Sequence, residues 1–418
     1  MELTLDALAG LTPEQQALRE SVADLLRRHP ARLDEEAGEA GAAEANAELW
    51  RRLAGIGAAG LAIPERYGGA GAGPVETSIV AEELGRTLAP VPLLGSAVLA
   101  AQAILGSGDE QACQRLLPGI ASGSRIAALA WTGARGGWDP AAAACHAERR
   151  VQRDGEADGI WTLTGTAHYV LDGDVADVLI VAASLPEGGI GLFEAATDRP
   201  GVERQAAAGV DQTRRLATIR LATGVGPPLT GAAPTGPAPT GAAPTAATTA
   251  TTVGTQALTR ARDLACVALS AEQVGAAARA LELTVAYTKQ RIQFGRPIAS
   301  FQAVQHRLAE LHALVQSARA LAYRAAQVAA SGASQAEVGL LAAAAKSCCS
   351  DVLAKVAAEA IQLHGAIGVT WEYDAHRYFK RAHGSGQLFG PPAAHLARIA
   401  DAVIGPAEPL ALADDLAF

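Results

Sequence analysis

The sequence is poor in aromatic residues, has a single methionine, and has cysteines without any ligand spacing. Phe, Tyr and Trp together make up 4% of 418 residues, whereas half of all residues are hydrophobic. Small apolar side chains, with alanine the most frequent, favour closely packed helices. The five cysteines form no CxxC or Cys/His pattern, so we predict no metal site and expect buried, reduced thiols.

Excess positive charge and membrane-spanning runs are also missing. The formal net charge is −9 and the pI is about 5.5, which excludes a general attraction to nucleic acid or to an anionic membrane surface. The first residues, Met1 to Asp6, lack the basic segment of a signal peptide, so we expect a cytoplasmic protein. The longest uncharged apolar stretch, residues 87–108, carries Pro90 and Pro92, which favours a buried helix over a membrane span.

The pattern of hydrophobic residues changes twice and predicts three domains. Residues 1–125 have helical periodicity, and Thr12-Pro13 has the composition of a helix start. Residues 126–257 form a small β domain with five short strands separated by Gly/Asp turns. Within it, residues 223–257 are a Pro/Thr/Ala-rich insert, which we predict to be a mobile, partly extended linker. The predicted strands are Ile126–Trp131, Ile160–Thr164, His168–Leu171, Val178–Ala182 and Leu216–Leu221.

Helical periodicity returns in residues 258–418. Long helices with short connections predict an antiparallel four-helix bundle. The fold class is therefore an α+β multidomain protein: an N-terminal helical domain, a middle β-barrel-like domain and a C-terminal four-helix bundle. The predicted helices of the bundle are Leu258–Gln290, Gln305–Ala330, Gln335–His364 and Tyr373–Ala382, followed by Pro392–Val403.

Residues 291–302 are the most informative segment, because they combine a cation, two aromatics, a glycine and a proline between two long helices. The planar donor fork of Arg291 suits a phosphate, and an aromatic such as Phe294 can stack on a flat ring. This combination fits a cofactor that carries both a pyrophosphate and heteroaromatic rings. An ordinary helix–turn–helix corner with solvated arginines is the alternative, and spacing alone leaves both open.

Several motifs together resemble the acyl-CoA dehydrogenase family over nearly the whole chain apart from the insert. The last two in chain order are the most specific. The matching segments are Gly60–Gly69, Glu82–Gly85, Leu117–Gly123, Trp161–Thr166, Glu272–Gly275, Tyr287–Gln302 and Ala360–Thr370.

The resemblance implies FAD as cofactor, an acyl-CoA or other acyl-thioester substrate, and tetramers built as dimers of dimers. It also admits an electron-transfer flavoprotein as a partner. Arg291 would contact the FAD pyrophosphate, Phe294 the adenine side, and Gln302 the same region, all on a neighbouring subunit. The remaining residues that the resemblance assigns to FAD are Gln362, with the backbone of Gly365 and Ala366, and the hydroxyl of Thr132 near the flavin pyrimidine ring. A helix C-cap is a second explanation for Gly365, and both can hold.

The family's chemistry is α,β-dehydrogenation, in which a carboxylate removes the α-proton while a hydride passes to the flavin. This sequence departs from that pattern at its centre. Phe389 stands where most members carry the catalytic Glu, and Ala265 stands at the alternative position on the first helix of the bundle. Asp263 is the nearest carboxylate, but two residues correspond to about 200° around a helix, so we expect it to face away.

Two further departures concern the flavin. Trp138 replaces a small residue that contacts phosphate, and Leu171 replaces a Thr that meets flavin N5. Three readings therefore remain open. The chain is a dehydrogenase with a displaced base, or a catalytically incomplete subunit of a heteromeric acyl-CoA dehydrogenase, whose known substrates include steroid side-chain CoA thioesters. In the third reading it is a flavin monooxygenase or other non-dehydrogenase on the same fold. The oligomer would be a homodimer or homotetramer, or a heterotetramer with a related subunit.

Overall fold

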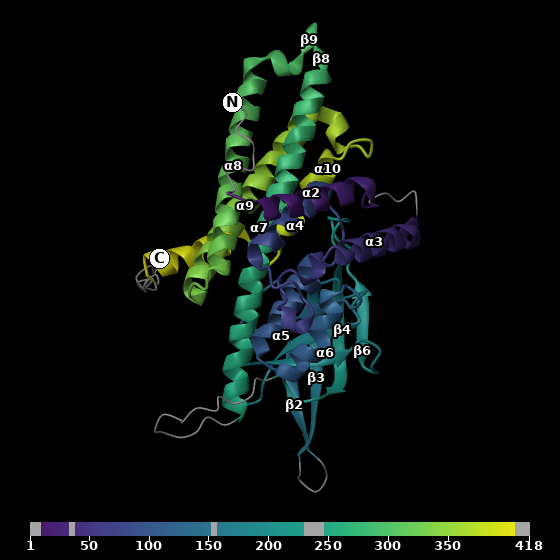
Figure 1. Cartoon of the computed structure of the whole chain (residues 1–418), viewed down its shortest axis with the longest axis vertical. Coiled ribbons are helices and arrows are strands. Elements are labelled where there is room, and N and C mark those ends of the chain that lie inside the picture. The colour runs from purple at the N-terminus through teal and green to yellow at the C-terminus, as the bar shows by residue number, and fades with distance from the viewer. Residues whose placement is uncertain (1–9, 33–37, 152–156, 230–245, 406–418) are drawn as a thin grey trace, which may run out of the picture.

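A computed structural model describes residues 10–32, 38–151, 157–229 and 246–405 of the chain. Figure 1 shows the sheet in the lower half of the molecule and the long helices extending above it. The N-terminal helices lie across the junction between the two. The described residues thus form the three kinds of layer that the sequence predicts: N-terminal helices, a middle sheet, and a C-terminal bundle.

The N-terminal domain begins with a capped helix at the predicted position. The Thr12 hydroxyl accepts a hydrogen bond from the Gln15 N–H at 3.3 Å, and the Gln15 side chain accepts one from the Thr12 N–H at 3.0 Å. The longer helices that follow are α2 (Pro13–Arg28), α3 (Gly38–Gly55), α4 (Pro74–Thr87), the π-helix η4 (Leu93–Ala100), α5 (Ala101–Ser107) and α6 (Glu110–Ala121).

The middle domain is a seven-stranded sheet with the order β1-β4-β2-β3-β7-β6, and β5 pairs with β4. The strands are β1 (Ala127–Ala130), β2 (Cys145–Val151), β3 (Ala157–Leu171), β4 (Val178–Ser184), β5 (Ile190–Ala196), β6 (Val202–Ala206) and β7 (Leu216–Val225). Two predicted strands are one element, because β3 continues through a register shift between Ala167 and Val170. The sequence did not predict β2, β5 or β6.

The insert was predicted wrongly at both of its ends. Residues 223–225 still pair within β7, and residues 246–257 are already helical; residues 230–245 lie outside the described part. A contact between this helix and the sheet explains why the helix starts before the predicted residue 258. A Cβ at Gly254 would lie 2.0 Å from the carbonyl oxygen of Ile190, so this turn packs directly onto β5.

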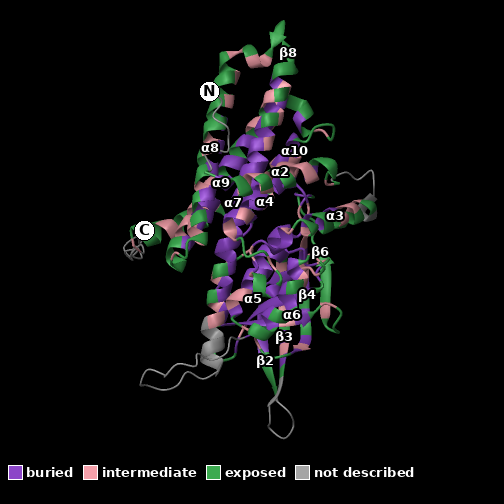
Figure 2. Cartoon of the chain, in the orientation of Figure 1, coloured by how far each residue is buried: buried purple, intermediate pink, exposed green. Residues whose placement is uncertain are grey.

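The bundle is built around one long, central helix. The most apolar 18-residue window within residues 253–290 of α7 is 94% buried, as expected for a core helix. Figure 2 shows the buried residues concentrated along it. The helices of the bundle are α7 (Ala246–Gln290), α8 (Gln302–Ala330), α9 (Gln335–His364), α10 (Ala375–Gln387) and α11 (Pro392–Val403).

Two glycines let α4 and α7 cross with their backbones in contact. A Cβ at Gly85 would lie 2.0 Å from the Glu272 carbonyl oxygen, and one at Gly275 would lie 1.9 Å from that of Glu82. No side chain fits in such a space. The crossing explains why the Glu82–Gly85 and Glu272–Gly275 motifs occur together, and it fixes the N-terminal domain against the bundle.

Candidate functional site

Phe389 lies in the turn between α10 and α11, at the position where the resemblance places a catalytic carboxylate. Its side chain is 2% exposed, and its backbone has a left-handed φ of 60°. Such a conformation is uncommon for a bulky residue. The side chain offers no proton acceptor, so this position supplies no general base.

Three aromatic rings fill the space beside this turn. The ring of Phe389 packs edge-on against Trp138, with centroids 5.3 Å apart, and Trp138 packs edge-on against Trp131, also at 5.3 Å. Leu171 lies in the same hydrophobic core. Trp138 and Phe389, two of the residues that depart from the family pattern, are thus in direct contact with each other.

The alternative base position on α7 is equally apolar. Ala265 is fully buried in the same core as Phe389. Beside it, burial raises the pKa of the Cys266 thiol to about 12, which keeps the thiol protonated. No titratable group at these two positions can accept a proton near neutral pH.

Asp263, the weak candidate for a base, is held in ion pairs. Its buried carboxylate accepts hydrogen bonds from Arg262 at 2.9 Å, from Arg398 at 3.1 Å, and from the Gln335 amide at 3.0 Å. Helix α7 continues without a break through this position. Gln335 lies on α9 and Arg398 on α11, so the Asp263 carboxylate is held by side chains of both helices.

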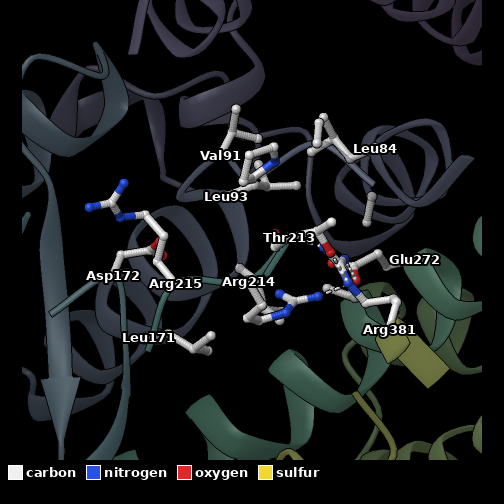
Figure 3. A pocket seen from close by; sticks show the side chains of 15 residues that line it. Leu84, Val91, Leu93, Leu171, Asp172, Thr213, Arg214, Arg215, Glu272 and Arg381 are labelled. Atoms are coloured by element: carbon white, nitrogen blue, oxygen red, sulfur yellow. Dashed lines mark hydrogen bonds and ion pairs between the residues drawn. The ribbon is translucent and has the colours of Figure 1, made fainter. Parts of the chain in front are cut away.

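Asp172 is a buried carboxylate that the sequence did not single out. It directly follows Leu171, and burial raises the pKa of its carboxyl to about 7. It lines a cavity of about 20 Å³, shown in Figure 3. This volume holds about one water molecule and leaves no room for an acyl chain. In the sequence, the only indication of a role for Asp172 is its position in a Leu-Asp-Gly turn.

The cavity adjoins a network of buried charges that joins the sheet domain to the bundle. The Arg381 guanidinium donates to Asp211 at 2.8 Å and to Glu272 at 2.6 Å, and Arg214 also pairs with Glu272. Figure 3 shows the side chains of Arg214, Glu272 and Arg381, which come from the segment before β7, from α7 and from α10. Their partners are one another, so we assign the network to domain packing.

A buried lysine, also missed from sequence, supports the turn that carries Phe389. The Lys346 ammonium donates to the carbonyl oxygens of Gly386 at 3.0 Å and Gly390 at 3.4 Å, and to the Ser350 hydroxyl at 2.9 Å. Burial lowers its pKa to about 8. Its position directly after four alanines is the only sequence signal for this role.

The segment with Arg291 and Phe294 forms a hairpin at the end of the bundle remote from the sheet (Figure 1). Strands β8 (Ile292–Gln293) and β9 (Arg296–Pro297) are joined by Phe294 and Gly295, both with positive φ, as in a type I′ turn. The Phe294 side chain is 91% exposed. Arg291 is exposed and makes no ion pair within the described residues. The helix–turn–helix alternative does not explain a projecting, left-handed phenylalanine.

The other predicted cofactor residues fall into two groups. Gln302, Gln362, Gly365 and Ala366 are exposed. Gly365 is also the C-cap of α9, with φ +67° and its N–H donated to α9 carbonyls, so the cap explanation holds too. Thr132, in contrast, is buried at the end of β1 in the sheet half of the molecule, where its hydroxyl donates to the His168 carbonyl at 2.7 Å.

The sequence matches two family domains. Residues 12–124 match "Acyl-CoA dehydrogenase, N-terminal domain" and residues 253–404 match "Acyl-CoA dehydrogenase, C-terminal domain". The chain belongs to the acyl-CoA dehydrogenase family. Its function is accordingly that of an FAD-dependent acyl-CoA dehydrogenase-like oxidoreductase.

Curated acyl-CoA dehydrogenases match almost end to end. The chain is 38% identical to acyl-CoA dehydrogenase IpdE2 of Mycobacterium tuberculosis, over 93% of this chain and 98% of that protein. It is 35% identical to IpdE2 of Mycolicibacterium smegmatis with the same coverage.

Solved structures of this family share the fold. One is titled a Tcur3481-Tcur3483 steroid acyl-CoA dehydrogenase variant (31% identity, TM-score 0.76, 94% of this chain and 98% of that chain). Another is the ChsE4-ChsE5 complex of Mycobacterium tuberculosis (28% identity, TM-score 0.76, 95% and 99%).

Proposed function

We propose that this chain is the base-lacking subunit of a heteromeric acyl-CoA dehydrogenase. A second, related chain supplies the catalytic carboxylate, and this chain supplies the Arg291 hairpin to the FAD of that chain. The observation that carries the proposal is the contact of Phe389 with Trp138. It places aromatic rings at both the base position and the flavin phosphate position of this chain.

The residues of this chain fit FAD in one place and not in the other. Around Thr132 they fit poorly, because Trp138 replaces a small residue and the Thr132 hydroxyl proton is already donated to His168. At the hairpin they fit well, because the Arg291 side chain makes no ion pair with any described residue and Phe294 is exposed. When bound, FAD accepts the hydride; the role of this chain is to hold its pyrophosphate and adenine.

The relatives support both the heteromer and a substrate class. Two of the similar structures have titles that name a pair of chains, and one of these titles also names a steroid. We therefore propose a steroid-type acyl-CoA thioester as the substrate and an electron-transfer flavoprotein as the electron acceptor. The curated relatives are named dehydrogenases, which gives no support to the monooxygenase alternative.

The experiment is to purify the chain alone, and then together with each acyl-CoA dehydrogenase chain of the same genome that carries Glu at the position of Phe389. Alone, we expect no bound FAD and no reaction. With the right partner, we expect one FAD per pair of chains and anaerobic bleaching by a steroid acyl-CoA. Bleaching by the chain alone would instead support a displaced base.

The hairpin is tested by Arg291→Ala in that complex. Loss of a charge-assisted contact with phosphate costs about 2 kcal/mol, or roughly thirtyfold in FAD affinity. The control is Arg220→Ala, an exposed arginine on β7, which should leave FAD affinity unchanged. Equal FAD affinities for the two variants would rule out the role of the hairpin.

A further inference from the structure

The cofactor-contacting surface proposed above has two halves that come from different parts of the chain. Arg291 and the hairpin follow α7, whereas Gln362, Gly365 and Ala366 lie at the end of α9 and the start of η6 (Gly365–Val369). A cofactor that touches both halves requires a fixed distance between them. The described structure shows how these two segments are joined.

Three aromatic rings connect these two segments. Tyr287 stacks on His364, with centroids 4.3 Å apart and planes 22° from parallel. Tyr373, from the loop before α10, packs edge-on against Tyr287 at 5.9 Å and against His364 at 5.8 Å. Each ring therefore touches the other two, and together they connect α7, α9 and the loop before α10.

Hydrogen bonds link Tyr287 to both halves of the surface, one through its backbone carbonyl and one through its ring hydroxyl. The Tyr287 carbonyl accepts the Arg291 N–H at 2.9 Å, one helical turn away. The Tyr287 hydroxyl donates to the His364 carbonyl at 3.3 Å, which orients the peptide leading into Gly365. The His364 ring is fixed in turn, because its Nδ1–H donates to the Ala360 carbonyl at 2.7 Å.

We propose that Tyr287 is a positioning residue that sets the spacing between the Arg291 hairpin and the Gln362–Ala366 turn, and so the affinity of the complex for FAD. It acts through its stack on His364 and its bond to the His364 carbonyl, not by touching the cofactor. The proposal rests on the function proposed above, since the FAD concerned is that of the partner subunit.

The test uses the purified complex with its partner and the dissociation constant for FAD. Tyr287→Phe keeps the ring stack and removes the hydroxyl, and we expect about fivefold weaker FAD binding for one lost hydrogen bond. Tyr287→Leu removes the stack as well, and we expect a loss on the order of tenfold or more. It should also change the visible circular dichroism of the bound flavin, which reports the geometry around it.

The matched control is Tyr378→Phe. Tyr378 is another buried tyrosine of the bundle, and its hydroxyl donates to the Arg86 carbonyl at 2.6 Å. Its loss should lower stability without changing FAD affinity or the flavin dichroism. If Tyr287→Phe and Tyr287→Leu change FAD binding no more than Tyr378→Phe, the positioning role is wrong.

The outcomes separate this inference from the proposed function. A wild-type complex without FAD, or one whose FAD affinity is insensitive to Arg291→Ala, overturns both. A complex that loses FAD affinity with Arg291→Ala and keeps it with both Tyr287 variants overturns the positioning role alone. Loss of affinity in all three supports both.

Discussion

Phe389 combines an uncommon backbone conformation with a side chain that has no acid–base chemistry. A left-handed φ on a bulky residue costs on the order of 1–3 kcal/mol. Here Lys346 offsets that cost by binding the carbonyls of Gly386 and Gly390 on either side. Lys346 thus holds this turn in place, and no carboxylate stands at position 389.

Restoring a carboxylate should not restore the reaction. Phe389→Glu places an acid in an apolar site, which destabilises the ionised form, and leaves Trp138 where flavin contacts belong. We expect no anaerobic flavin bleaching by acyl-CoAs in the isolated chain, even with added FAD. The control is Phe389→Leu, which keeps the site apolar. Bleaching by the Glu variant would mean that the flavin site of this chain is intact.

Asp172 should make stability depend on pH. Its folded pKa of about 7 lies above the unfolded value, so the folded state binds the extra proton between roughly pH 4 and 7. Stability from this group is present below that window and is lost as pH rises through it. Asp172→Asn should therefore gain on the order of 2–4 kcal/mol relative to wild type between pH 5 and pH 8.

The measurement is urea unfolding of both proteins at the two pH values. Val175→Ala, an exposed neighbour without a titratable side chain, is the control, and its effect should be the same at both pH values. An Asp172→Asn difference that is the same at pH 5 and pH 8 would contradict the raised pKa.

At the scale of elements, the helices were predictable and the weaker strands were not. Thr12 and the periodic apolar residues define α2 and the bundle helices in the sequence. In contrast, β2 has the sequence Cys-His-Ala-Glu-Arg-Arg-Val, in which buried and exposed residues alternate only over the first four positions, and β6 is mostly exposed. β2 and β6 are strands because they pair with neighbouring strands of the sheet. The local sequence pattern does not show which segments will pair.

In the candidate site, too, local features were predictable from sequence and contacts between distant segments were not. Motifs placed the hairpin, Phe389 and Ala265, because these are local in sequence. The contacts of Trp138 with Phe389, and of Tyr287 with His364, join segments far apart in the chain. Asp172 and Lys346 were missed for that reason, since their burial comes from elements that pack on them and not from their neighbours in sequence.

The α4–α7 crossing gives an element-scale prediction. Gly275→Ala places a Cβ within 1.9 Å of the Glu82 carbonyl oxygen, so the two helices must separate. We expect a loss of about 3 kcal/mol or more in the free energy of unfolding, measured with urea. Gly386→Ala is the matched control, since no atom lies within 4 Å of its Cβ, and it should be neutral or stabilising. Equal effects of the two substitutions would contradict the close crossing.

At the scale of the whole molecule, the two sets of cofactor residues lie at different ends. Thr132 is in the sheet half, and the hairpin is at the far end of the bundle (Figure 1). One copy of the chain therefore does not enclose an FAD between them. The arrangement favours an assembly in which this chain reaches a cofactor seated on its neighbour.

The most direct test is the ratio of FAD to protein chains, measured by flavin absorbance and protein mass for the isolated chain and for the complex with its partner. The account predicts no FAD on the isolated chain and one FAD per two chains in the complex. One FAD per chain on the isolated protein, reduced by an acyl-CoA, would contradict it.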